Sequence, residues 1–175
     1  MRRHQRNRLT RVLAAGVVAT GLAFSAVGTG PASADSGPVQ QQLSAVRAAT
    51  AKYHNVDMAI AAGYTPTEEC VPGMGYHYIN YGLFGKMDPL APDALLYEAK
   101  KNGQLRLVGV EWLKPDADQD LATDEDRPSL FGKGFDGPML GHGPGMPIHY
   151  DLHAYLWKSN PDGVLATWNP NVTCP

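Results

Sequence analysis

Three histidines, His142, His149 and His153, lie within twelve residues near the C-terminal end of the sequence. A fourth, His77, lies in a short aromatic segment flanked by glycine, which could fold back toward the other three. Neutral imidazoles together with carboxylates are the donors that bind zinc, copper, iron or manganese on rigid protein elements. The sequence therefore predicts a divalent transition-metal site.

Methionines accompany these histidines at Met74, Met139 and Met146. Their soft thioether groups suit copper, which keeps copper among the alternatives. Methionine is more often a packing residue of the protein interior, so the pattern does not select copper over the other metals.

The ligand set depends on the conformation of residues 148–158. In a helix, His149 and His153 would lie one turn apart on one face and could bind the same ion. In a strand they would be about 13 Å apart, at ~3.3 Å per residue, and Asp151 would be the same-face neighbour of each. Alternation of apolar with polar and aromatic residues favours the strand, and the helix stays open as an alternative.

The clearest local pattern of secondary structure is in residues 94–113, where an Asn-Gly pair joins two β-prone runs. This pattern predicts a hairpin. A two-residue turn places Glu98 opposite Leu107 and Glu111 opposite Ala94, so that both carboxylates share one sheet face. Glu111 belongs to the more apolar strand, where an unpaired charge would be costly, so it needs a metal or a histidine as partner.

These residues define a candidate site. We predict a metal held by His77, Glu111, His149 and His153, with His142, Asp151 and Glu98 beside these ligands or substituting for one of them. In an enzyme, such a metal would polarise the substrate or activate water or dioxygen. The alternative is a non-catalytic secreted or envelope-associated protein that binds a small-molecule ligand through its aromatic side chains, without a metal.

The N-terminal end of the sequence is predicted to be a cleavable signal peptide, residues 1–34. Five arginines in the first eleven residues precede an apolar stretch at 12–27 and an Ala-Ser-Ala sequence just before Asp35. The apolar stretch is too short and too rich in glycine and alanine to span a membrane. We expect Sec-type export and a secreted mature domain, residues 35–175.

Cleavage would make the protein acidic. Loss of the five arginines takes the formal net charge from −2 to −7. An acidic surface argues against nucleic acid or an anionic membrane as partner. The sequence also has no serine-hydrolase elbow, no phosphate-binding glycine loop with lysine and no H-E-x-x-H zinc motif.

Only two cysteines are present, Cys70 and Cys174. In an oxidising compartment, an even pair is most simply one disulfide, which here would close a loop of about 100 residues. With both thiols paired, histidines and carboxylates are the remaining metal ligands.

The remaining pattern predicts an α+β fold. Residues 38–62 have helical periodicity, as one amphipathic helix or as a pair bent near residue 55. Residues 148–158 and 164–168 are expected to form a second hairpin, and the segments rich in glycine and proline, 67–92 and 114–147, to form long loops. The helix would then pack on an antiparallel sheet of hairpins in one secreted domain.

Five segments together carry a resemblance to other proteins: residues 73–78, 107–112, 130–132, 135–139 and 146–153. They resemble a group of exported actinobacterial proteins without an assigned function. The resemblance spans most of the mature chain and implies a secreted single domain. It implies no particular reaction, so no catalytic role is transferred from it.

Overall fold

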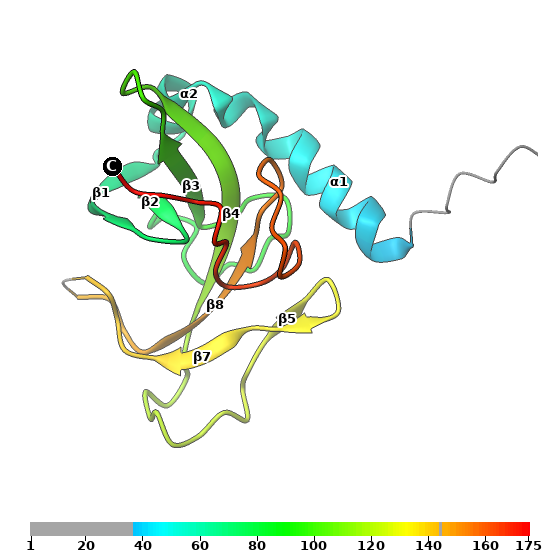
Figure 1. Ribbon diagram of the computed structural model, residues 1–175. Helices are drawn as coiled ribbons and strands as arrows, with labels where there is room; N and C mark the ends of the chain where they lie inside the picture. The colour runs from blue at the N-terminus through cyan, green and yellow to red at the C-terminus, as the bar shows by residue number, and fades with distance from the viewer. Residues whose placement is uncertain (1–36, 144) are drawn as a thin grey trace, which may run out of the picture. The chain divides into compact units, whose positions relative to one another are not determined.

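The helical part comes first in the computed structural model, which describes residues 37–143 and 145–175; the predicted signal peptide lies outside these ranges. Helix α1 (Pro38–Thr50) continues into a short 3₁₀ helix (Ala51–His54) and is followed by α2 (Val56–Ala61). Asn55 caps α2, because its side chain accepts a hydrogen bond from the backbone N–H of Asp57. The helical segment is therefore bent at the predicted position (Figure 1).

A six-stranded antiparallel sheet forms the rest of the fold, in the order β1-β2-β3-β4-β8-β7. Its strands are β1 (Thr65–Val71), β2 (Gly75–Ile79), β3 (Ala94–Ala99), β4 (Leu105–Pro115), β7 (Asp136–Met139) and β8 (His149–Ala154). Strands β5 (Ser129–Leu130) and β6 (Lys133–Gly134) form a separate small pair. A helical segment together with an antiparallel sheet confirms the α+β class.

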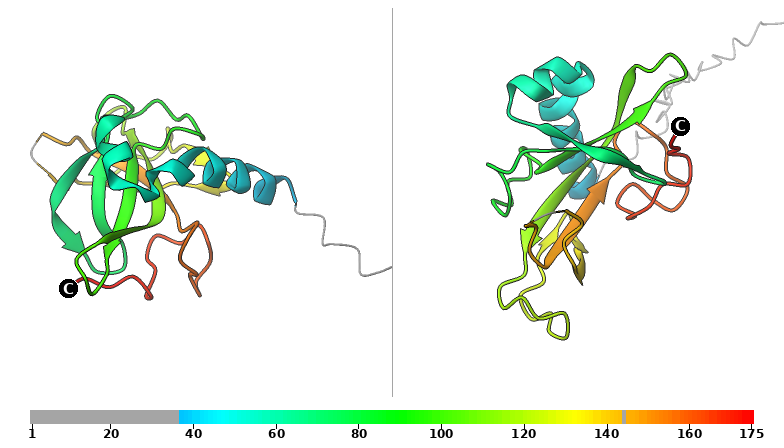
Figure 2. Two further views of the ribbon diagram at one scale, coloured as in Figure 1. Left: turned by 90° about the horizontal axis from the view of Figure 1, so that it is seen from above. Right: turned by 90° about the vertical axis from the view of Figure 1, so that its left-hand side faces the viewer.

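Buried apolar residues lie on both faces of the large sheet. Leu43 and Val46 of α1 belong to the same buried apolar cluster as Trp112 of β4. On the other face, Leu96 of β3 is buried in a second cluster with Val172 of the C-terminal segment. Figure 2 shows α1 and the C-terminal segment on different sides of the sheet. The second face is the one that carries the candidate metal ligands.

The predicted hairpin is present as β3 and β4, and its register is partly as predicted. Glu111 lies opposite Ala94, as expected, but Glu98 lies opposite Arg106, so its predicted pairing with Leu107 is wrong. The turn is longer than two residues, and the register shifts by one residue along the hairpin. Such a shift is the mark of a β-bulge, in which one strand carries an extra residue.

The second predicted hairpin is only half right. Residues 149–154 form strand β8, which decides between the strand and the helix alternatives, but residues 164–168 form no return strand. One edge of β8 pairs with β4 and the other with β7, which comes from a segment predicted as loop. Because both edges of β8 are paired, no edge is left for a return strand beside it.

The predicted disulfide is present between Cys70 and Cys174, which are 104 residues apart in sequence. It joins β1 to the C-terminal end of the chain, and Figure 1 shows that end beside β1. Within the described residues, no helix has the length and apolar character needed to cross a membrane.

Candidate metal centre

Three strands bring three of the predicted ligands to one place on the sheet. Glu111 of β4 lies directly opposite His153 of β8. On its other side, Glu111 lies opposite Ala94 of β3, and His77 comes from β2, the next strand along. Neighbouring strands are about 4.8 Å apart, so His77 must reach over β3 to meet Glu111. His77 lies opposite Leu96 of β3, whereas Glu111 lies opposite Ala94, so the two ligands meet diagonally across this strand.

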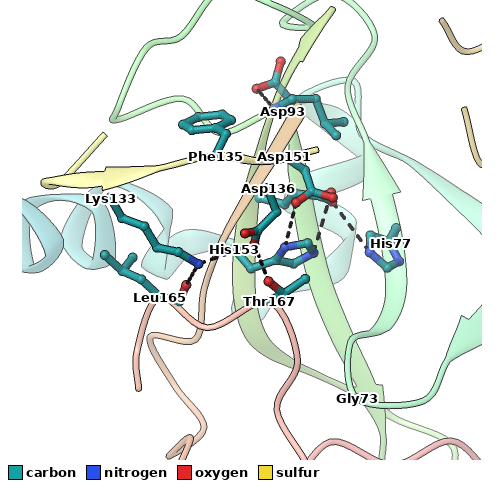
Figure 3. Close-up of polar contacts among 12 residues, drawn as sticks. Gly73, His77, Asp93, Lys133, Phe135, Asp136, Asp151, His153, Leu165 and Thr167 are labelled. Carbon is teal, nitrogen blue, oxygen red and sulfur yellow. Dashed lines mark hydrogen bonds and ion pairs between the residues drawn. The ribbon is translucent and has the colours of Figure 1, made fainter. Parts of the chain in front are cut away.

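The distances within this cluster suit a shared ion. One oxygen of Glu111 is 3.6 Å from Nε2 of His77, and the other is 3.6 Å from Nε2 of His153. The three ligand atoms all lie within 4.8 Å of one another. Hydrogen bonds are shorter, about 2.7–3.2 Å, whereas two donors ~2.1 Å from a tetrahedral ion lie about 3.4 Å apart. The cluster could therefore hold a metal ion, and Figure 3 shows His77 and His153 directed toward a common point.

The carboxylate of Asp151 lies on the other side of the His153 imidazole. Its Oδ1 is 3.5 Å from Nδ1 of His153, so the ring lies between Asp151 and Glu111. Both ring nitrogens of His153 and Oδ1 of Asp151 are buried without a hydrogen-bond partner within the described residues. A carboxylate on the far nitrogen of a histidine is the usual support of a metal ligand, because it fixes the ring and its tautomer.

The surroundings shift the pKa of all three candidate ligands. Burial lowers the pKa of His77 to about 3, with His153 as the next contribution, so this imidazole is neutral near neutral pH. It raises the pKa of Glu111 to about 8, because the carboxylate loses its hydration. For His153, burial opposes protonation, but the carboxylates of Glu111 and Asp151 outweigh it and raise the pKa. A bound divalent cation would favour neutral imidazoles together with an ionised carboxylate.

His149 is not part of this cluster. In a strand it is separated from His153 by about 13 Å along the backbone, at ~3.3 Å per residue. Its Nδ1 lies 3.1 Å from the carbonyl oxygen of Pro147, and its ring centroid lies 5.1 Å from that of His142. The structure therefore pairs His149 with His142 and leaves both outside the group of His77, Glu111 and His153.

The structure does not bring Glu98 to the histidines either. Its buried carboxylate is paired with Arg106 and Lys158, and it accepts a hydrogen bond of 3.0 Å from the backbone N–H of Thr173. Burial opposes its ionisation, but the hydrogen bonds from Lys158, Thr173 and Arg106 outweigh this and lower the pKa to about 2. Glu98 thus anchors the C-terminal segment to the sheet.

This pairing makes the contribution of Glu98 to stability dependent on pH. Replacing Glu98 with glutamine is expected to lower the free energy of unfolding near neutral pH by about 1.5–3 kcal/mol, the usual contribution of hydrogen bonds to a charged group. Because the folded-state pKa is depressed, this contribution is complete above about pH 4.5 and is lost as the pH falls toward about 2. Urea unfolding of both proteins at neutral pH and at about pH 3 measures it; a difference that does not shrink in acid would contradict the assignment.

A cavity of about 480 Å³ adjoins the cluster, and His77, Glu111 and Asp151 form part of its wall. The three methionines noted in the sequence, Met74, Met139 and Met146, also line it. Thr67 and Glu69 of the edge strand β1 line it as well. The sequence did not predict these two residues, because no local pattern shows which residues of an edge strand will face a cavity formed by distant segments.

Comparison of the chain with protein families, with curated proteins and with solved structures finds no match. The chemistry of the site therefore follows from its own geometry: two imidazoles and one carboxylate on three strands of one sheet, with a cavity on one side.

Proposed function

We propose that this is a metal-binding protein in which Nε2 of His77, the carboxylate of Glu111 and Nε2 of His153 hold a divalent transition metal. The observation that carries the proposal is the pair of 3.6 Å separations between the carboxylate oxygens and the two imidazole nitrogens, in a site with unpartnered buried nitrogens. Separations of this size are longer than hydrogen bonds and close to the spacing of donors around a tetrahedral ion.

The donor set also limits which metals and reactions are reasonable. Two histidines and one glutamate hold catalytic zinc, and two histidines with one carboxylate hold iron(II) in oxygenases. Both arrangements leave a coordination position for water or substrate. Zinc is the first metal to test, because the donor spacing fits a tetrahedral ion. A zinc ion with an open position would activate water or polarise a carbonyl group.

A non-catalytic ligand-binding protein without a metal is the second candidate. The cavity favours it, because its volume of about 480 Å³ and its methionine-rich wall resemble those of small-molecule sites. In that case the buried Glu111 would be neutralised by its own proton or by His153, without an ion.

Secretion is part of the proposal. The disulfide between Cys70 and Cys174 is consistent with an oxidising compartment, where such bonds form and persist. The signal peptide predicted at residues 1–34 would direct the chain there. N-terminal sequencing of the protein from the culture medium of an expressing cell tests this directly, with Asp35 as the expected first residue.

Replacing Asp151 with asparagine tests the metal site without removing a ligand. We expect the affinity for zinc to fall by roughly 10–100-fold, because Asp151 orients the imidazole of His153 and raises its basicity. Competition with a coloured chelator measures the affinity.

Asp136→Asn is the matched control for this substitution. Asp136 lies opposite Asp151 in the β7–β8 pair, but its carboxylate is bonded to Thr167 and Lys133 (Figure 3). This variant removes the same charge nearby and should keep zinc affinity within about threefold of wild type, since it leaves His153 oriented. Equal losses in both variants would mean that Asp151 acts through its charge alone and would contradict an orienting role.

A further inference from the structure

We infer that the cavity beside the cluster is a binding site for a small, largely apolar molecule that is neutral or cationic and donates one lone pair to the metal. This inference rests on the proposed metal site and names the class of ligand that the site would take. It follows from where the cavity meets the cluster and from the chemistry of the cavity wall.

The cavity lies on the side of the cluster where a fourth ligand would bind. His77, Glu111 and Asp151 all contribute to its wall, whereas His153 does not and is almost fully buried behind them. Three protein ligands of a tetrahedral ion leave one position free. With His153 on the protein side, that free position would face the cavity.

The wall is mainly apolar. Besides the three methionines it includes the aliphatic side chains of Val71, Ile79 and Leu113. Two aromatic side chains, Tyr81 and Trp168, also line the cavity and are more than half exposed, so they mark its opening to solvent. A volume of about 480 Å³ is at the smaller end of the range for small-molecule sites. The space therefore suits a small molecule with an apolar body.

The charges of the wall select against anions. Glu69, Glu111 and Asp151 line the cavity, and no lysine or arginine does so among the described residues, so the charge of the three carboxylates would exceed that of a bound divalent ion. Sites for anionic groups in proteins are built from arginine, lysine or backbone N–H groups. A neutral or cationic molecule with one nitrogen or oxygen donor would satisfy the open metal position without a repulsive charge.

Cobalt(II)-loaded protein provides the test, because its visible absorption changes when a ligand coordinates the ion. Imidazole and phenylimidazole offer the same donor and differ in the apolar ring. We expect phenylimidazole to bind roughly 10–100-fold more tightly than imidazole, because moving its apolar phenyl ring from water into the cavity is favourable. Benzoate, which has the same ring and an anionic donor, should bind more weakly than phenylimidazole.

Two neighbouring substitutions localise the effect. Met139 lines the cavity, whereas Leu140 beside it points to solvent with 64% of its surface exposed. Met139→Gln should reduce the preference for phenylimidazole by roughly fivefold, since it places a polar amide on the wall, and Leu140→Gln should leave the preference unchanged. Neither residue belongs to the cluster that would hold the metal.

The outcomes separate the inference from the proposed function. Failure of the protein to bind any of cobalt, zinc, copper, iron and manganese overturns the metal site, and the inference with it. Binding of cobalt with equal affinities for imidazole and phenylimidazole overturns the inference alone. Tighter binding of benzoate than of phenylimidazole overturns the assignment to neutral or cationic ligands.

Discussion

Replacing Glu111 with glutamine is expected to abolish tight metal binding without weakening the metal-free fold. Glu111 is the carboxylate that both imidazoles approach, so no other side chain of the cluster can substitute for it. The loss of zinc affinity should exceed the roughly 10–100-fold that substitutions around a metal ligand cause. The metal-free variant should melt at or above the wild-type temperature, because the substitution removes a carboxylate that burial disfavours.

Thermal unfolding with and without zinc separates these two effects. At a zinc concentration about 100 times the Kd, binding stabilises the wild type by about 2.7 kcal/mol, which corresponds to a rise in Tm on the order of 10 °C for a domain of this size. Glu111→Gln should show no such rise. Glu68→Gln, at an exposed position on β1, is the control and should behave as wild type. An equal rise for wild type and Glu111→Gln would remove Glu111 from the ligand set.

Removing the disulfide is expected to have the largest effect on stability. In the chain-entropy account, the bond between Cys70 and Cys174 closes a loop of 104 residues and contributes about 4.7 kcal/mol. The double substitution Cys70→Ala with Cys174→Ala should therefore lower the Tm by about 10–20 °C. Scanning calorimetry measures this change, and a decrease below about 3 °C would contradict it.

The same variant should keep its metal site. The candidate ligands lie on β2, β4 and β8, whereas the disulfide joins β1 to the C-terminal segment. We therefore expect zinc affinity of the folded double variant to stay within about tenfold of wild type, as for changes that leave the ligands and their supporting residues in place. A complete loss of zinc binding in the folded variant would show that β1 contributes directly to the site.

Local sequence patterns predicted much of what positions the cluster. Alternation in residues 148–158 indicated a strand, which the structure has at 149–154, and a strand necessarily places Asp151 and His153 on one face. The hairpin around the Asn-Gly pair put Glu111 opposite Ala94, which the structure confirms. In a strand, His149 and His153 are about 13 Å apart. The predicted site, in which both histidines bind the same ion, would therefore have needed a helix at residues 148–158.

The remaining features depend on pairings between distant parts of the chain. Nothing local to Glu111 indicates that His153, on a strand far along the sequence, lies opposite it. The pairing of β7 with β8, which prevents the predicted return strand, is equally non-local. Strand order of this kind is set by the packing of the whole sheet and is not encoded in any single segment.

Gly109 is a local sign of the register shift in the hairpin of β3 and β4. Gly109 lies within an apolar strand, where a glycine often marks a bulge or a close backbone approach. A Cβ atom at this position would come within 2.8 Å of the carbonyl oxygen of Ala154. The register shift that moves Glu98 opposite Arg106 occurs next to it in the hairpin. A glycine at this position therefore speaks against the pairing of Glu98 with Leu107.

Metal content tests the central claim most directly. Untagged protein would be equilibrated with zinc and separated from loosely bound ions by gel filtration. Inductively coupled plasma mass spectrometry would then give the number of metal ions per chain. We predict one ion per chain for wild type and for His54→Ala, whose histidine is exposed on the 3₁₀ helix, and less than about a tenth of an ion for His77→Ala. Wild-type protein with less than about a tenth of an ion per chain, whether offered zinc, copper, iron or manganese, would contradict the account.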